Sequence, residues 1–520
     1  MTSKLLTSLI AVLFLYGACS QNQDLYDLLN LEEITVEELQ EGYQNGDFTI
    51  QQVTNAYLNR IDAIDKNGVR LNSMGAVNPN ALEIAAELDR ELQEGNIRGP
   101  LHGIPIVIKD NIDTFDMPTT AGSRFLDGSI PPKDAFITQK LREQGAIILG
   151  KTNLSEWANF HSSFGSSGWS GLGGQVNNPY DLTRNPCGSS SGSGAAVSAN
   201  LASIAIGTET NGSIVCPSNA NGVVGFKPTV GLWSRSGIIP ISYTTDSAGP
   251  MTRTVRDAAI LLGALAGVDQ NDELTLAAEE HTHSDYTQFL DENGLRGKRI
   301  GLHTQTLGGH FRVDTLVHQT VRKLEELGAE VIEIERISEV NIGGDAFRVL
   351  LYEFKDGLNK YFASLGENAP VKSVDELAEM TRNSPEETAM FDRDLIFQAA
   401  EAGDLDSDEY RESLERMLRY SREEGIDKVM EEHNLDAIMA PTGSPAWKSD
   451  HTMGDNFRVG SSSPSARAGY PIITVPMGEL DGLPVGISFF GKAWSEPVLL
   501  EVAYAFEQAT MHRMVPQFRR

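Results

Sequence analysis

The chain has 520 residues, of which 40% are hydrophobic and 22% are charged, so it can bury a large hydrophobic core. Its 72 acidic and 42 basic residues give a formal net charge of −30. This charge excludes an ordinary nucleic-acid-binding protein, because binding to phosphate backbones depends on Lys and Arg, and it is typical of an acidic, well-hydrated surface.

The chain begins with a segment that is typical of a secretion signal. Lys4 precedes the apolar residues 5–18, which are too few to span a membrane as a helix. We therefore expect residues 1–18 to be a signal peptide. The sequence GAC at 17–19 is similar to a bacterial lipoprotein processing site, which predicts cleavage before Cys19 and lipidation of that cysteine, with plain secretion as the alternative. The expected location is the bacterial cell envelope, with a lipid anchor as the only contact with the membrane.

Polar residues at 19–32 predict a tether, after which the folded domain is expected over 33–520. Two capping-box patterns follow, each with a threonine and then Glu or Gln three positions later, and each predicts the start of a helix. A third helix is expected over 80–92. The two capping boxes are Thr35-x-x-Glu38 and Thr49-x-x-Gln52.

Short apolar runs bounded by Gly or Pro recur through the rest of the chain and alternate with helical patterns. Such runs predict strands that are buried on both faces, and the alternation predicts an α/β fold with a parallel or mixed sheet covered by helices. The runs are 104–108, 146–149, 204–206, 223–226, 300–302, 438–439, 472–475 and 485–489.

Residues 345–434 differ from the rest of the chain. Their pattern is helical, they are rich in charge, and they hold much of the acidic excess. We interpret them as a helical insertion in an otherwise continuous domain, because no linker composition separates them from their neighbours.

Two segments of small residues carry serines, at 187–194 (CGSSSGSG) and 207–214 (GTETNGSI), and Lys109 ends the apolar run before them. Backbone N–H groups exposed by Gly-rich turns, beside hydroxyls and a lysine, are the components of an acyl-transfer site. The G-x-S-x-G pattern centred on Ser190 is an alternative nucleophile elbow, but that pattern does not explain the lysine or the second segment. A lysine that pairs with Asp110 for structural reasons alone is a further alternative.

These motifs resemble those of the amidase signature family. The resemblance implies one large mixed β-sheet sandwiched between helical layers, with the helical insertion beside the active site, where it shapes substrate access. Two long stretches are most similar to the peptide-amidase branch, which removes the C-terminal amide of peptides. The short motifs are IKD at 108–110, GSS at 188–190 and NGSI at 211–214, and the long stretches are 164–194 and 207–231.

The resemblance implies a catalytic triad made of Ser213, Ser189 and Lys109. Ser213 would be the nucleophile, and Ser189 would be a bridging serine that follows a cis peptide bond. Lys109 would be the base, and it would have to be neutral to accept a proton, which burial favours by lowering the pKa of a lysine. No metal and no organic cofactor is expected.

The resemblance also implies an oxyanion hole formed by the backbone N–H groups of Thr210, Asn211, Gly212 and Ser213, with Gly212 permitting the tight turn. Ser190 is expected to help orient the lysine and the bridging serine. Asn211 is a departure, because the peptide-amidase branch has Asp at this position. The substitution keeps a turn-forming side chain but removes a negative charge, which bears on substrate specificity rather than on amide chemistry.

Three cysteines occur, Cys19, Cys187 and Cys216. If Cys19 is lipidated, no disulfide framework remains. We expect Cys187 and Cys216 to be buried unpaired thiols rather than a bridge or a nucleophile.

The predicted function is therefore hydrolysis of carboxamides, of small molecules or at the C-terminus of peptides, to a carboxylate and ammonia. A broad-specificity aliphatic and aromatic amidase is one alternative. A tRNA-dependent amidotransferase A-like subunit is another, which the signal segment and the acidic charge oppose. A non-catalytic lipoprotein that binds amides is a third, which the presence of all three triad residues opposes.

Overall fold

The computed structural model describes residues 25–520, so the predicted signal peptide and Cys19 lie outside the described residues. Within the described range, no helix is both long enough and apolar enough to cross a membrane. The C-terminal end of the predicted tether, residues 19–32, belongs to the folded domain instead. Helix α1 (Leu25–Leu28) lies there, and both Tyr26 and Leu31 are buried in the core.

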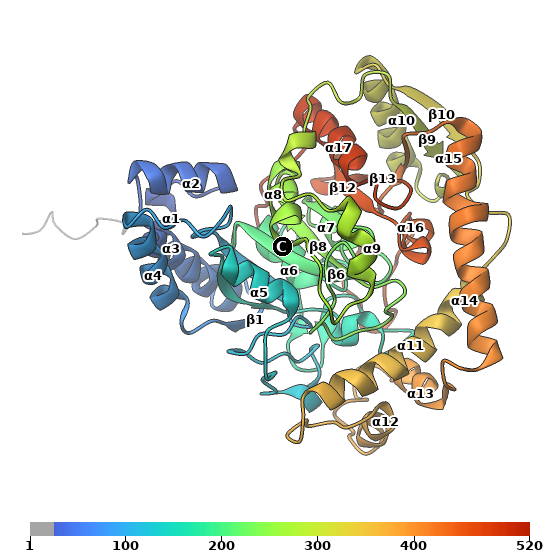
Figure 1. The fold of residues 1–520 in the computed structure, drawn as a ribbon, viewed down its shortest axis with the longest axis horizontal. Helices are drawn as coiled ribbons and strands as arrows, with labels where there is room; N and C mark the ends of the chain where they lie inside the picture. The colour runs from blue at the N-terminus through green and yellow to red at the C-terminus, as the bar shows by residue number, and fades with distance from the viewer. Residues whose placement is uncertain (1–24) are drawn as a thin grey trace, which may run out of the picture.

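An 11-stranded mixed sheet forms the centre of the molecule, with helices packed against it (Figure 1), as predicted. All eight apolar runs form strands, and three further strands complete the sheet. Parallel pairs lie near both ends, and antiparallel pairs join them in the middle. The spatial order is β1 (Met74–Val77), β3 (Ile147–Thr152), β2 (Pro105–Lys109), β6 (Ile204–Glu209), β8 (Ser247–Thr252), β7 (Val224–Lys227), β12 (Ile472–Leu480), β13 (Leu483–Phe490), β11 (Ala437–Pro441), β9 (Arg299–His303) and β10 (Glu330–Ile334).

Both predicted capping boxes are confirmed at the first long helices. In each, the threonine hydroxyl accepts the N–H of the third helical residue, whose side chain accepts the N–H of the threonine. These bonds satisfy N–H groups that a helix start leaves unpaired. The helices concerned are α2 (Val36–Asn45) and α3 (Ile50–Arg60), and the third predicted helix is α4 (Ala81–Gln93).

Two short helices follow the serine-bearing segments. All eight residues of α6 (Ser191–Ser198) and all six of α7 (Val215–Ala220) are buried. α6 contacts β2, β3 and β6, while α7 contacts β7, β12 and β13. Only glycine fits at position 192 of α6, since a Cβ there would collide with the carbonyl oxygens of Ser73 and Asn153. The glycine at this position of the motif is therefore a packing requirement.

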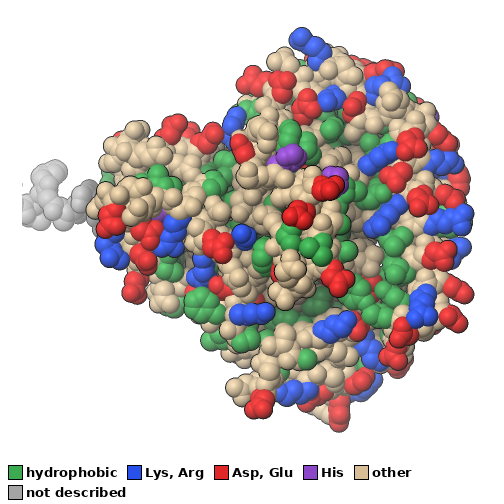
Figure 2. Space-filling view, in the orientation of Figure 1, with side chains coloured by type: hydrophobic (Ala, Val, Ile, Leu, Met, Phe, Trp, Pro, Cys, Tyr) green, Lys and Arg blue, Asp and Glu red, His purple; other side chains and the backbone are tan. Residues whose placement is uncertain are grey.

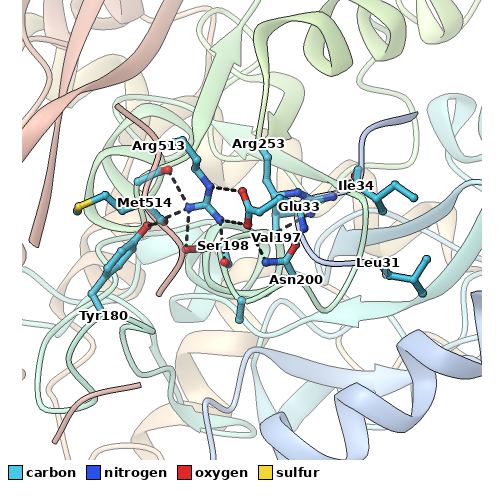
Figure 3. A network of polar contacts seen from close by, with 12 residues as sticks. Leu31, Glu33, Ile34, Tyr180, Val197, Ser198, Asn200, Arg253, Arg513 and Met514 are labelled. Atoms are coloured by element: carbon cyan, nitrogen blue, oxygen red, sulfur yellow. Dashed lines mark hydrogen bonds and ion pairs between the residues drawn. The ribbon is translucent and has the colours of Figure 1, made fainter. Parts of the chain in front are cut away.

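A polar network fixes the C-terminal end of α6 to both ends of the described chain (Figure 3). Arg513 binds both carboxylate oxygens of Glu33, at 3.0 and 2.9 Å, and donates to the carbonyl of Ser198 at 2.9 Å. Asn200 donates to Glu33 at 2.7 Å. The helix that follows Ser189 and Ser190 is thus held at its far end.

The helices that the sequence predicts as an insertion form an arm along one side of the body (Figure 1, gold to orange). The first packs its aromatic residues Phe354 and Phe362 against Trp157 and Ile241 of the body. The arm is therefore joined to the body by a shared hydrophobic cluster. Its helices are α11 (Gly343–Ser364), α12 (Val374–Arg382), α13 (Asp394–Glu401), α14 (Asp408–Ser421) and α15 (Asp427–His433).

The remaining helices cover the sheet or close the ends of its strands. Acidic and basic side chains are scattered over the face shown in Figure 2, which has a hollow lined by hydrophobic side chains near its centre. The helices are α5 (Phe136–Glu143), α8 (Val255–Leu265), α9 (Leu274–Ala278), α10 (Phe311–Glu326), α16 (Ser463–Ala468) and α17 (Glu496–Thr510).

Candidate active site

Lys109 is the last residue of β2 and is completely buried. Its Nζ lies 2.6 Å from Ser189 Oγ and 2.8 Å from Thr208 Oγ1, and it donates to the Thr208 carbonyl at 3.2 Å. No carboxylate of the described residues forms an ion pair with it. Burial lowers the pKa of Lys109 to about 7, although the nearby charges of Asp246 and Glu209 oppose this effect. The neutral amine that a base requires is therefore accessible near neutral pH.

Ser189 follows a cis peptide bond with Gly188, and this feature of the predicted site is confirmed. The Ser189 side chain is buried, and its carbonyl accepts the N–H of Ser155 at 3.1 Å. The Ser189 hydroxyl therefore contacts Lys109, while its backbone is held by Ser155, in the loop that follows β3.

Ser190 connects the two serine-bearing segments. Its N–H donates to the carbonyl of Ser213 at 3.1 Å, and its Oγ donates to the Thr208 carbonyl at 3.0 Å and accepts the Thr208 N–H at 3.1 Å. Ser190 thus fixes the position of Ser189 relative to β6 and to Ser213. Ser213 Oγ itself makes no hydrogen bond with another residue in the range 25–520.

The loop that carries Ser213 turns at Gly212, whose φ of +87° is in the left-handed region that favours glycine. The backbone N–H groups of Asn211, Gly212 and Ser213 make no hydrogen bond within the described chain, so they are available as donors. The Glu209 carboxylate accepts the two N–H groups that follow Ser213, from Ile214 at 2.7 Å and Val215 at 3.0 Å. The acid thereby holds the start of α7.

The side chains of Thr210 and Asn211 are held by residues outside the loop. Thr210 donates to Asp246 at 2.6 Å. Asn211 accepts from Ser462 at 2.7 Å and donates to Ser463 at 3.2 Å, both at the start of α16. These contacts fix the loop from both sides while leaving its N–H groups free.

The prediction of unpaired thiols at Cys187 and Cys216 is wrong, because the two cysteines form a disulfide bond. One sulfur precedes the cis peptide and the other lies in α7, so the bridge joins the two serine-bearing segments directly. The sequence alone did not favour this pairing, because the cysteines are 29 residues apart and their proximity depends on the packing of α6 and α7 against the same sheet.

The structure places Ser189 against Lys109 and joins the backbone of Ser190 to that of Ser213. It adds three residues that the sequence did not single out. Thr208 contacts the lysine, Glu209 holds the start of α7, and Asp246 is a partly buried acid whose pKa is raised by desolvation to about 6. Thr208 and Glu209 lie within the motif 207–214, so their position was a usable signal. No local pattern marks Asp246.

The fold is α/β, with a mixed sheet, and a buried lysine contacts a serine that follows a cis peptide bond, beside a loop of free N–H donors. These features are typical of an amide hydrolase. The sequence profile of the family described as Amidase matches residues 52–500. The chain belongs to the amidase signature family.

Relatives match this chain over almost its whole length. The structure of native peptide amidase from Stenotrophomonas maltophilia is 47% identical, with a TM-score of 0.91, and covers 95% of this chain and 100% of that chain. A structure of the peptide amidase PAM in complex with the competitive inhibitor chymostatin is 48% identical, with a TM-score of 0.92, over 94% of this chain and 100% of the other. A protein of Arabidopsis thaliana described as a probable amidase is 40% identical over 98% of this chain and 96% of its own length.

Proposed function

We propose that the protein is a serine amidohydrolase that converts the C-terminal carboxamide of peptides to a carboxylate and ammonia. The contact of 2.6 Å between Lys109 Nζ and Ser189 Oγ carries the proposal, because it couples a lysine of lowered pKa to a serine. The full-length similarity to peptide amidase supports peptides as the substrate class.

In the acylation step, Ser213 Oγ attacks the carbonyl carbon of the amide. Its proton passes to Ser189 Oγ, whose own proton passes to Lys109 Nζ. The attack creates a negative oxygen, and the free N–H groups of the loop that precedes and includes Ser213 are the donors that can stabilise it. The relay then runs in reverse, so that the nitrogen of the breaking C–N bond leaves as ammonia and an ester remains on Ser213.

In the deacylation step, a water molecule attacks the ester carbon and gives a proton to the same relay. The second tetrahedral intermediate collapses, Ser213 Oγ recovers its proton, and the carboxylate product leaves. The same three side chains thus serve both half-reactions, and each must be present for turnover.

The substrate preference follows from the buried position of the nucleophile, since Ser213 is only 8% exposed. A small leaving group such as ammonia is accommodated more easily there than a continuing peptide chain. The test compares one peptide as its C-terminal amide and as its free acid. We expect ammonia from the amide, no reaction of the acid, and intact internal peptide bonds in both.

The other functions correspond to other outcomes of the same assay. Turnover of aliphatic and aromatic amides without a preference for peptides would indicate a broad amidase. Ammonia from glutamine only in the presence of a charged tRNA and partner subunits would indicate an amidotransferase subunit. No turnover of any carboxamide would indicate a binding protein and would refute the proposal.

We also propose that the protein resides in the bacterial cell envelope, anchored by lipid at Cys19. The apolar segment and the sequence GAC at 17–19 motivate this proposal. The Cys187–Cys216 disulfide supports it, because such bonds persist in oxidising compartments.

A further inference from the structure

A cavity of about 220 Å³ lies beside the nucleophile loop, between the body and the helical arm. Thr210 and Asn211 form one wall, so the cavity begins two residues before Ser213. The arm contributes apolar side chains, Phe347 and Leu350 from α11 and Met417 from α14. The cavity therefore adjoins the loop that carries Ser213 and has an apolar wall.

Arg467 of α16 closes this cavity and is the one charged side chain that lines it. It is partly buried, and among residues 25–520 it makes no hydrogen bond and no ion pair. Its Nε is fully shielded and has no acceptor. Burial lowers the pKa of Arg467, and no acid opposes this effect. A shielded N–H without an acceptor is costly, because this donor has lost water and gained no partner in exchange.

Other partly buried arginines of the chain do have acceptors. Arg235 binds the carboxylate of Asp272, and Arg422 donates to the carbonyl of Ala468 at 2.7 Å. The chain has a large excess of acids, yet among the described residues none of them forms an ion pair with Arg467. The missing acceptor is therefore a particular property of this cavity.

The surroundings of the guanidinium favour an anion. A Cβ on Gly343 would lie 3.9 Å from Arg467 Nη2, so this nitrogen is close to the first residue of α11, whose N-terminus has no side-chain cap. The start of a helix carries partial positive charge. The acid in this first turn, Asp345, is already engaged by Arg416 at 3.2 Å.

Asn211 keeps the cavity free of negative charge on the catalytic side. Its amide is held by Ser462 and Ser463 and carries no charge. The cavity beside the loop that carries Ser213 thus holds a cation without a partner and a neutral amide.

We propose that Arg467 binds a carboxylate of the substrate, so that the enzyme prefers carboxamides of peptides with an acidic side chain, Asp or Glu, near the amide that is cleaved. This inference rests on the proposed amidase function and specifies its substrate. The guanidinium forms paired hydrogen bonds with the carboxylate, and the apolar wall contacts the methylene groups of the acidic side chain.

The test measures ammonia release from matched peptide amides that differ only in Glu or Leu at the last or the penultimate position. In the wild-type enzyme, we expect kcat/KM for the preferred Glu peptide to exceed that of its Leu counterpart. Arg467→Met should lower kcat/KM for that Glu peptide by about 10- to 100-fold, the factor expected for the loss of a hydrogen bond to a charged group. It should change kcat/KM for the Leu peptide by less than about twofold. Arg467→Lys keeps the charge but not the paired geometry, so it should retain an intermediate preference.

The matched control is Arg336→Met. Arg336 lines a neighbouring cavity of about 330 Å³ that Arg467 also borders, but that cavity does not include the nucleophile loop. We expect this variant to keep the wild-type preference. An equal loss for Arg336→Met and Arg467→Met, or an equal loss of both peptides in Arg467→Met, would overturn the inference.

Two other outcomes separate this inference from the proposed function. Ammonia from Leu peptides at rates equal to or above those from Glu peptides would refute the role of Arg467 and leave the amidase function intact. No ammonia from any peptide amide would refute both. Glutarate, a dicarboxylate without an amide, is an independent probe: it should inhibit the wild-type enzyme at lower concentration than Arg467→Met, and equal inhibition would count against carboxylate binding.

Discussion

At the residue scale, burial gives Lys109 the lowered pKa that a base at neutral pH requires. A lysine in water is protonated at neutral pH, with a pKa near 10.4. Here the side chain is enclosed by β2, β6 and the serine segment, and burial lowers its pKa to about 7. Its polar contacts are hydroxyl and carbonyl oxygens rather than a carboxylate, so nothing in direct contact restores the charge.

The first residue-scale prediction concerns the triad. Lys109→Met, Ser189→Ala and Ser213→Ala should each reduce kcat by roughly three orders of magnitude or more, because the three groups move one proton in sequence. The measurement is steady-state ammonia release, with circular dichroism to check the fold. Lys227→Met is the matched control, since Lys227 is also completely buried, but among the described residues its Nζ donates only to the Pro228 carbonyl. Near-normal kcat in Ser189→Ala would refute the relay.

A second residue-scale prediction concerns pH. The base is active when neutral, so kcat/KM should rise as pH passes the pKa of Lys109 near 7 and stay high in alkali. The negative charge of Asp246 raises this pKa, so Asp246→Asn should move the midpoint to lower pH by roughly half a unit or more. Thr210→Val removes a hydrogen bond that lowers the pKa of Asp246, so less of Asp246 is charged, and the midpoint should move in the same direction as in Asp246→Asn but by less. A midpoint that moves to higher pH in Asp246→Asn would contradict this electrostatic account.

At the scale of elements, the sequence predicts what local patterns determine. The capping boxes at Thr35 and Thr49 and the eight apolar runs all form the expected structures, because caps and buried strands have local signatures. Strand β8 (SAGPMT) was missed, since it contains Gly249 and Pro250, which have low strand propensity. It is a strand because β6 and β7 pair with it on either side.

The disulfide is the clearest error of the sequence interpretation and gives an element-scale prediction. The bridge closes a loop with a sequence separation of 29 residues and joins the cis-serine segment to α7. Replacing Cys187 and Cys216 by Ser together should lower the free energy of unfolding by about 3–4 kcal/mol. It should also lower kcat, because the two segments lose their covalent connection. Denaturant unfolding with and without dithiothreitol tests this: the reductant should destabilise the wild type only, and equal stability of both proteins would refute it.

The helical arm gives a second element-scale prediction, through Arg393. This side chain is 1% exposed and lies 3.3 Å from Glu156 of the body and 3.5 Å from Glu387 of the arm. Burial raises the pKa of Glu156 to about 7, so its charge depends on the arginine. Arg393→Met should destabilise the fold by about 3–5 kcal/mol, because it leaves two buried acids without this arginine. Glu387 would still form an ion pair with the half-exposed Arg124, whereas Glu156 would have none within the described chain.

A rescue variant separates charge from packing at this cluster. Adding Glu156→Gln and Glu387→Gln to Arg393→Met removes the uncompensated charges, so most of the lost stability should return. Thermal unfolding measures each variant. If the triple variant is as unstable as Arg393→Met, the arginine stabilises the arm by packing alone.

At the scale of the whole molecule, the site is assembled from residues that are far apart in sequence. The motifs at 108–110, 188–190 and 211–214 identify the central side chains, because each motif is a contiguous pattern. The supports are not contiguous with them: Ser155 holds the backbone of Ser189, and Ser462 and Ser463 hold Asn211. Sequence reasoning could name the predicted triad but not these contacts, because they exist only once the sheet and the last third of the chain have packed together.

The location of the whole molecule yields the last prediction. The Cys19 thiol would form the thioether to lipid, and serine cannot form that bond. In a bacterial host that processes lipoproteins, the wild-type protein should partition into the detergent phase of Triton X-114, and Cys19→Ser should lose this partitioning, with its precursor unprocessed or released to the aqueous phase. The net charge of −30 makes the folded part strongly hydrated, so the detergent phase would be reached through the lipid rather than through the surface.

Ammonia release should be unchanged in a purified chain that starts after Cys19, since the described site does not include the anchor. Aqueous partitioning of both full-length proteins would instead indicate plain secretion, and detergent partitioning of both would place the membrane contact elsewhere in the chain.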